Sequence, residues 1–356
     1  MKKLLLSALL LCGGGAFAQN GPASGDDPAT TQALESRVDE LETRTSAWQK
    51  IAARLPKFSG YVQAGYQYTD TSSDFFLKRV RLSLAGDIVA GKLDYKIQFE
   101  FCKPQLVDAF IQYKPLPQLN LKVGQYKVPF SIENTEYIPT KLEFIEYPLV
   151  LRKLMGFSDV CGLSATGRDL GATLCGGFFE RDGYRILNYD LGVFNGEGMN
   201  TLDKNKSKDI AARLTLKPAA GLSICGSYYR GEYGASYFRR ERYGVGACYD
   251  HGPLVVRGEW IGGRTGSADG CFDSNGWYAM AGWRAPHDLT PVARVESFTE
   301  DDRIGSATRQ TNYTVGLLWT PVKYLRCQLN YTYEDYGAAY DLTGRNVVAV
   351  MFTGMF

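Results

Sequence analysis

The stretch Lys92-Leu93-Asp94-Tyr95-Lys96-Ile97-Gln98-Phe99-Glu100-Phe101 alternates strictly between polar and apolar side chains. Successive side chains of a β-strand point to opposite faces of the sheet, so a strand here has one charged and amide-bearing face and one wholly apolar face. Soluble sheets also alternate, but many such strands with Tyr and Trp near their ends are typical of a barrel that is apolar outside and wet inside.

The same alternation recurs from Phe58 to the last residue, Phe356. We expect an all-β transmembrane barrel of about sixteen antiparallel strands, an even number as single-chain bacterial barrels require. Short turns should lie at one rim, with long loops such as 195–207, 264–274 and 334–344 at the other. The predicted strands are 58–69, 75–89, 92–102, 106–114, 119–127, 169–180, 184–194, 208–217, 221–231, 238–250, 253–263, 275–285, 289–300, 311–320, 322–333 and 346–356.

The first residues have the composition of an export signal. Lys2 and Lys3 precede an apolar run over residues 4–11, and Ala16-Phe17-Ala18 precedes Gln19. This pattern predicts a signal peptide over 1–18, cleaved after Ala18. The run is shorter than the roughly 20 apolar residues of a spanning helix. Cys12 leaves a lipoprotein as an alternative, disfavoured by the bulky leucines before it.

Residues 19–57 differ in character from the rest, with a loose Gly/Pro/Ser/Asp linker followed by a heptad pattern that Pro56 ends. Arg37 and Glu42 occupy g and e positions, so two parallel copies would match in charge. The pattern favours a periplasmic coiled-coil helix, and a single amphipathic helix is the alternative. The alternating a and d positions are Leu34, Val38, Leu41, Thr45, Trp48, Ala52 and Leu55.

Charge and cysteine content exclude several classes of site. Removal of Lys2 and Lys3 leaves 38 basic and 38 acidic residues, so no global field draws nucleic acid or anions. Seven cysteines follow residue 18, without a C-x-x-C pair, so no zinc site and no cofactor are expected. Their odd number prevents complete pairing, although Cys161 could bridge to Cys175 or Cys271. The cysteines are Cys102, Cys161, Cys175, Cys225, Cys248, Cys271 and Cys327.

A barrel of this size leaves an aqueous channel, and strand register assigns many charged side chains to it. Arg257-Gly258-Glu259 and Arg294-Val295-Glu296 each place an arginine and a carboxylate on one face. The simpler interpretation of each pair is an ion pair within the wall, and contact with permeant ions is the alternative.

The link 128–168 is too long and too apolar for a mobile surface loop, so we expect it to fold inward and constrict the channel. Residues 149–157 would form a short helix or the constriction itself, which would bring Arg152 and Lys153 to the narrowest point. The candidate pore-lining and constriction residues are Arg79, Arg81, Lys96, Lys122, Lys127, Arg152, Lys153, Arg168, Arg257 and Arg294.

An enzyme is not expected, because a nucleophile would need a base and an orienting partner. His251 and His287 are the only histidines, and both lie in turn sequences, His251-Gly252-Pro253 and Pro286-His287-Asp288.

Four further segments carry a resemblance to a known family. They are Gly124-Gln125-Tyr126-Lys127-Val128-Pro129-Phe130-Ser131, then Gly167-Arg168-Asp169-Leu170-Gly171, then Tyr189-Asp190-Leu191-Gly192-Val193-Phe194-Asn195-Gly196-Glu197-Gly198 with Lys208-Asp209-Ile210-Ala211-Ala212-Arg213-Leu214. Together they resemble the phosphate-selective porin O and P family over residues 58–356. The N-terminal heptads resemble a periplasmic coiled coil of some members.

The resemblance implies a sixteen-stranded, usually trimeric porin in the outer membrane of a Gram-negative bacterium. It implies passive passage of small hydrophilic solutes and ions, with an inward third loop and, in the best-known members, a cationic ladder for anions such as phosphate. Here the basic candidates alternate with carboxylates, so ion selectivity is an open point. A structural or adhesive barrel with little transport is the alternative function. The interleaved carboxylates are Asp94, Glu100, Asp108, Glu259 and Glu296.

Overall fold

The computed structural model describes residues 36–41, 55–163, 166–301, 307–337 and 344–356. The chain divides into two units, Met1–Leu55 and Pro56–Phe356. In the first unit, residues 36–41 are helical and expose Val38, while the signal peptide and most of the expected heptad positions lie outside the described residues. None of the helices formed by the described residues is long and apolar enough to cross a membrane.

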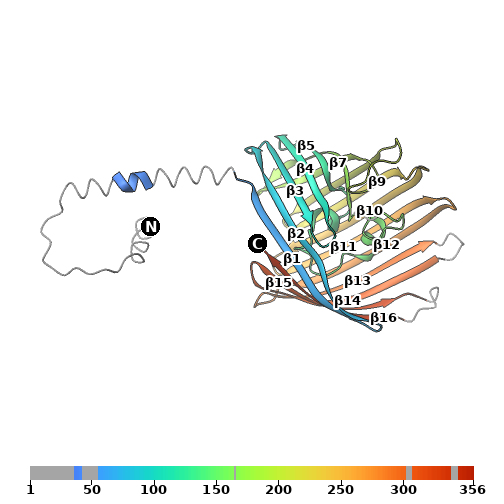
Figure 1. Ribbon diagram of the computed structural model, residues 1–356. Coiled ribbons are helices and arrows are strands. Elements are labelled where there is room, and N and C mark those ends of the chain that lie inside the picture. The colour runs from blue at the N-terminus through green and yellow to red at the C-terminus, as the bar shows by residue number, and fades with distance from the viewer. Residues whose placement is uncertain (1–35, 42–54, 164–165, 302–306, 338–343) are drawn as a thin grey trace. The chain divides into compact units, whose positions relative to one another are not determined.

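The second unit is a closed barrel of sixteen antiparallel strands (Figure 1), which confirms the predicted fold class. Each strand pairs with its neighbours in sequence, and β1 closes the barrel against β16 with Tyr61 opposite Met355. The strands are β1 Lys57–Thr69, β2 Ser73–Val89, β3 Leu93–Glu100, β4 Gln105–Leu116, β5 Leu119–Lys127, β6 Arg168–Arg181, β7 Tyr184–Phe194, β8 Asp209–Ala219, β9 Leu222–Tyr233, β10 Phe238–His251, β11 Leu254–Ser267, β12 Gly270–Trp283, β13 Leu289–Asp301, β14 Ala307–Val322, β15 Leu325–Asp335 and β16 Arg345–Met355.

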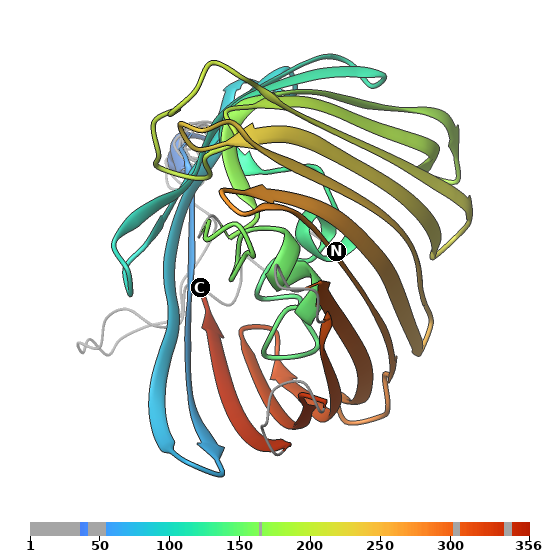
Figure 2. The same cartoon turned by 90° about the vertical axis from the view of Figure 1, so that its right-hand side faces the viewer.

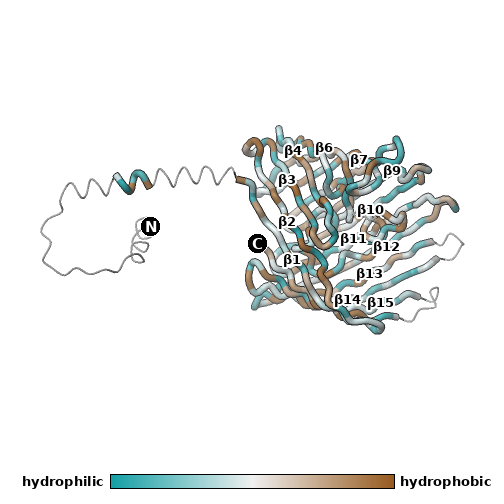
Figure 3. Tube along the Cα trace, in the orientation of Figure 1, coloured by the Kyte–Doolittle hydropathy of each residue, from teal (hydrophilic) through white to brown (hydrophobic). Residues whose placement is uncertain are grey.

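The two faces of the wall follow the alternation. In β3, Ile97 and Phe99 are exposed on the outside, whereas Gln98 and Glu100 are buried on the inside. Hydrophilic and hydrophobic residues accordingly alternate along the strands (Figure 3). The polar side chains face the lumen because an ionised group facing lipid would be costly.

The prediction of a long loop over residues 264–274 is wrong. Residues 264–274 are mostly strand, because β11 continues to Ser267 and β12 begins at Gly270, with Arg264 paired opposite Asp273. These strand ends are polar on the outside as well as inside, so the sequence there loses the apolar period that marked the other strands.

The link between β5 and β6 lies inside the barrel (Figure 2). It contains two short helices, α2 Ile132–Glu136 and α3 Leu149–Leu154. We call residues 128–167 the inner loop.

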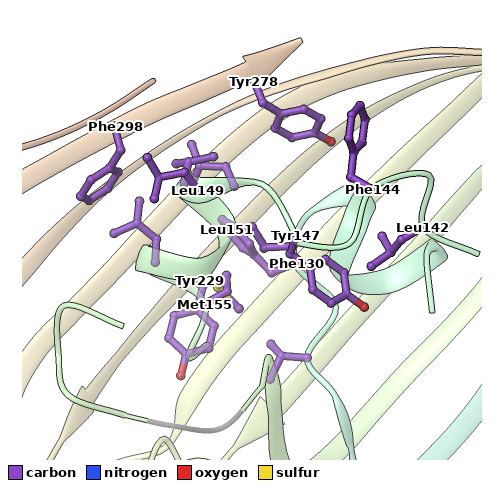
Figure 4. Close-up of a cluster of buried hydrophobic side chains, with 14 of the residues drawn as sticks. Phe130, Leu142, Phe144, Tyr147, Leu149, Leu151, Met155, Tyr229, Tyr278 and Phe298 are labelled. Carbon is purple, nitrogen blue, oxygen red and sulfur yellow. The ribbon is translucent and has the colours of Figure 1, made fainter. Parts of the chain in front are cut away.

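Apolar packing explains why the inner loop is on one side of the lumen. Phe130, Leu149 and Leu151 are fully buried against inward-facing side chains of β11 to β13 (Figure 4). Burial of such side chains stabilises by about 1.5–3 kcal/mol each. The wall side chains in this cluster include Val255, Ile261, Tyr278, Met280, Val292 and Phe298.

Candidate functional site

Hydrogen bonds with wall side chains hold the inner loop against β11, β13 and β15. Glu259 of β11 accepts from Ser131 Oγ at 2.6 Å and from the Ile132 amide at 3.1 Å. Glu296 of β13 accepts from the Leu149 amide at 2.7 Å. Gln328 of β15 donates to the Leu142 carbonyl oxygen at 3.0 Å. The loop backbone therefore finds its buried partners in the wall, as buried polar groups require.

A cavity of about 360 Å³ remains between the inner loop and the wall of β3 to β8, and we call it the main chamber. Five basic side chains line it against three carboxylates, so its formal charge is net positive. The cations are Lys96, Lys122, Lys127, Arg168 and Arg213, and the carboxylates are Asp108, Glu136 and Asp190.

Each carboxylate of the main chamber is close to a cation. Asp108 accepts from Lys96 Nζ at 2.8 Å and from Arg168 Nε at 2.7 Å. Arg213 donates to Glu136 of the inner loop and lies 3.9 Å from Asp190 Oδ2. These contacts leave the negative charge of the chamber largely compensated.

Lys122 and Lys127 differ from the other cations, since neither forms an ion pair with a carboxylate among the residues that the structure describes. Lys122 Nζ lies 4.7 Å from the ring centroid of Phe110 and 5.1 Å from that of Tyr126. Lys127 Nζ lies 5.3 Å from the Tyr147 centroid and donates to the Tyr147 hydroxyl at 3.2 Å. Aromatic faces attract an ammonium group without neutralising its charge.

The main chamber continues toward the end of the barrel at which β1 begins and β16 ends. A second cavity of about 330 Å³ lies there, among residues close to the turns at 117–118, 182–183 and 220–221. Both cavities share Glu136, Cys175, Asp190 and Arg213 as lining. The shared lining makes one continuous polar route along β5 to β8.

On the far side of the inner loop is a smaller cavity of about 170 Å³, which we call the side pocket. Three arginines and three carboxylates line it, and contacts such as Arg152 Nη1 to Glu146 Oε2 at 3.9 Å pair their charges. The arginines are Arg152, Arg294 and Arg345, and the carboxylates are Glu146, Glu296 and Glu334. Ile145 of the inner loop packs with Ala349 and Met351 of β16 next to it. The open, net positive space is therefore on the β3 to β8 side.

The structure separates the predicted pore-lining residues into groups. The main chamber brings together Lys96, Lys122, Lys127 and Arg168, whereas Arg152 and Arg294 line the side pocket. Lys153 follows Arg152 in α3 and lines neither cavity.

The remaining three predicted residues are held within the wall or against the loop. Arg79 donates to Gln63 Oε1 at 2.8 Å, and Arg81 donates to Glu100 Oε2 at 2.8 Å. Arg257 is 1% exposed and contacts the inner loop.

Arg213, Glu136 and the aromatic partners of the lysines were missing from the predicted set. Strand alternation places Arg213 on the inner face with Asp209, but its partner Glu136 is 77 residues away in the inner loop. The Phe110 ring faces the lumen from β4. The inner face of this strand is otherwise polar at Asp108 and Gln112, so the alternation did not predict an apolar side chain there.

The His, Cys, Asp and Glu side chains of the described part of the chain were predicted to form no zinc site. No group of three His, Cys, Asp or Glu side chains there could hold a metal ion. All seven described cysteines are free thiols, and Cys175, Cys225, Cys248 and Cys327 lie in strands as expected.

Comparison with known proteins places this barrel in a family. Residues 50–230, half of the chain, match the family described as phosphate-selective porin O and P. The chain belongs to that porin family. It is an outer-membrane porin of the Gram-negative type, a channel rather than an enzyme, as its sequence predicted.

Solved structures of other proteins share the fold of this porin at low sequence identity. An anion-selective porin from Comamonas acidovorans is 15% identical with a TM-score of 0.67, covering 85% of this chain and 99% of its own. The trimer form of OmpT from Vibrio cholerae is 11% identical with a TM-score of 0.62, covering 85% and 99%. The outer membrane channel DcaP of Acinetobacter baumannii is 13% identical with a TM-score of 0.58, covering 85% and 97%. No curated protein matches the porin.

Proposed function

We propose that this porin conducts small hydrophilic anions through the main chamber, with Lys122 and Lys127 as its selective charges. The observation that carries the proposal is the presence of two lysines that form no ion pair with any described carboxylate, in a chamber that the inner loop narrows. Within about 8 Å, the screening length at physiological ionic strength, two uncompensated positive charges in a confined space raise the local concentration of anions.

Phosphate is the anion that we propose first. At neutral pH it is a mixture of the monoanion and the dianion, so the two ammonium groups attract it, and Lys96, Arg168 and Arg213 supply further N–H donors around the same chamber. The family description and the solved anion-selective porin from Comamonas acidovorans agree with this choice. Compensated charges such as Asp108 are expected to keep binding weak enough for release.

The assembly that we propose is a homotrimer in the outer membrane, with residues 1–18 removed as a signal peptide. Residues 19–57 would form a linker and a periplasmic coiled-coil helix ahead of the 58–356 barrel. The OmpT structure in trimer form supports a trimer. A short coiled coil would be sufficient because the trimeric barrel raises the effective concentration of its strands.

Planar-bilayer recording of the purified full-length porin tests the function. Under a KCl gradient, we expect ohmic steps in groups of three and a reversal potential on the anion side, with phosphate reducing the chloride current. Channels without anion preference would contradict the proposed selectivity, while the function as a porin would stand. Absence of conductance from correctly folded protein would favour the structural or adhesive barrel.

A further inference from the structure

Arg257 of β11 holds two distant parts of the inner loop at once. Its Nε donates to Glu133 Oε1 at 2.7 Å, and its Nη2 donates to Glu143 Oε2 at 2.6 Å. The two carboxylates are ten residues apart in the chain, so a single guanidinium closes the segment between them. Forked, charge-assisted hydrogen bonds of this kind are strong and directional.

The same guanidinium also fixes a residue that contacts a selective lysine. The Arg257 guanidinium carbon lies 3.7 Å from the ring centroid of Tyr137, which is between Glu133 and Glu143 in the loop. The Tyr137 carbonyl oxygen accepts from Lys127 Nζ at 3.4 Å and from the Tyr147 hydroxyl at 3.0 Å. Tyr147 in turn presents its ring to Lys127. Contacts therefore run without interruption from Arg257 to the Lys127 ammonium.

Burial prevents Arg257 from contacting permeant ions directly. Its side chain is 1% exposed, and the Glu133 side chain is 2% exposed. Burial raises the pKa of the Glu133 carboxyl, although the adjacent Arg257 charge acts in the opposite direction. An arginine so fully buried affects the channel only through the loop residues that it contacts.

The neighbouring arginine of the wall behaves differently. Arg294 of β13 contacts Glu296 of its own strand at 3.2 Å. It reaches the inner loop through the Glu146 carbonyl oxygen and the ring of nearby Phe144, whose centroid lies 4.5 Å from the guanidinium carbon. Arg257 does not pair with Glu259 of its own strand and instead contacts two loop carboxylates. Of these two wall arginines, Arg257 alone bridges separate loop segments.

We propose that Arg257 is a positioning residue for selectivity: by clamping Glu133, Glu143 and Tyr137, it sets the position of Lys127 at the main chamber. This inference rests on the proposed anion selectivity. The clamp itself should also affect the noise of the open-channel current, whatever the sign of the permeant ion, so it can be tested separately.

The test compares full-length Arg257→Gln with Arg264→Gln in planar bilayers. Arg264 is on the same strand but is exposed and paired with exposed Asp273, so its loss should leave the current unchanged. In Arg257→Gln we expect greater open-channel noise and a fall in the anion-to-cation permeability ratio of about threefold, because the Lys127 charge is displaced by several ångströms. Arg257→Lys should be intermediate, since a single ammonium lacks the planar fork.

A triple variant, Arg257→Met with Glu133→Gln and Glu143→Gln, removes the buried charges along with the clamp. The clamp can then still be tested if Arg257→Gln fails to fold. Heat-modifiable mobility in gels checks whether each variant is folded. We expect the triple variant to fold and to repeat the noise and the lost selectivity. A folded triple variant with wild-type noise and permeability ratio overturns the clamp. A wild-type channel without anion preference contradicts the proposed function instead. In that case the comparison of open-channel noise between the variants still tests whether Arg257 clamps the inner loop.

Discussion

The ammonium nitrogen of Lys122 lies 4.7 Å from the ring centroid of Phe110, on the wall of the main chamber. An aromatic ring contributes about 0.5–2 kcal/mol to holding a cation and leaves its charge in place. A carboxylate at the same position would hold the lysine more tightly and cancel the charge that an anion needs. Phe110 and Tyr126 thus combine a fixed position with an uncompensated charge.

Replacing Lys122 by Gln should reduce anion selectivity while leaving the barrel intact. One unit charge at about 4 Å in water corresponds to about 1 kcal/mol, so the permeability ratio should fall about fivefold. Reversal potentials under a KCl gradient measure this ratio. Lys92→Gln, at an exposed turn before β3, is the matched control and should match the wild type. An unchanged ratio in Lys122→Gln would remove Lys122 from the selective set.

Phe110→Leu should weaken selectivity by a smaller factor than Lys122→Gln, because the charge remains but loses its aromatic support. Tyr126→Phe keeps the second ring and removes only the hydroxyl, which donates to Thr173 Oγ1 at 2.8 Å. We expect Tyr126→Phe to retain the wild-type permeability ratio. If both variants keep the wild-type permeability ratio, the Phe110 and Tyr126 rings only fill space and do not support the Lys122 charge.

The sequence predicted the wall well because strand alternation is a local property. Lys96 and Lys122 both follow polar–apolar alternation, and both face the lumen as expected. Their different charge states depend on partners elsewhere: Lys96 meets Asp108, whereas Lys122 meets two rings. Local pattern therefore predicts which side chains face water, and it does not predict which charges remain uncompensated.

The inner loop shows the same limit more strongly. Its length and apolar content predicted an inward fold, but the wall residues that hold it are far away in sequence. Ser131 and Glu259 are 128 residues apart. The Arg257-Gly258-Glu259 motif suggested an internal ion pair, whereas each side chain contacts the loop separately. A single sequence gives no signal for such contacts.

Gly124 is expected to be intolerant of a side chain. Its φ is +133°, and a Cβ there would lie 2.2 Å from the Ala109 carbonyl oxygen and 2.7 Å from the Phe110 Cα. Gly124→Ala should therefore destabilise the barrel by about 1–3 kcal/mol or separate β4 from β5 beside Lys122. Refolding yield in detergent measures the loss. Gly226→Ala, where a Cβ meets nothing within 4 Å, should refold like the wild type.

Glu146 should stabilise the inner loop down to acidic pH. Burial favours its neutral form, but Lys78 and Arg152 outweigh burial and lower the pKa of Glu146 from 4.5 to about 2. A depressed carboxyl pKa stabilises the fold above the unfolded value, and the contribution disappears as pH falls through the folded value.

The advantage of wild type over Glu146→Gln in urea unfolding should thus be constant above about pH 5 and shrink between 4.5 and 2. Because the Glu146 side chain is 48% exposed, solvent screening should keep the difference below about 1 kcal/mol. Glu180→Gln, at an exposed end of β6, is the control. A difference that is already lost at pH 6 would contradict the ion pairs.

Cys175 should make the conducting route visible without any engineered thiol. It lines both the main chamber and the cavity below it, whereas Cys225 and Cys248 are buried behind the inner loop. A negatively charged methanethiosulfonate reagent should therefore reach Cys175 through the pore and reduce the current in steps. It should react faster than a positively charged reagent of equal size, because Lys122 and Lys127 attract it. Cys175→Ser should abolish the block, and Cys271→Ser, which removes a thiol exposed on β12, should leave it unchanged. Block that persists in Cys175→Ser would place the current elsewhere in the lumen, and equal rates for the two reagents would show that the lysine charges are not felt along this route.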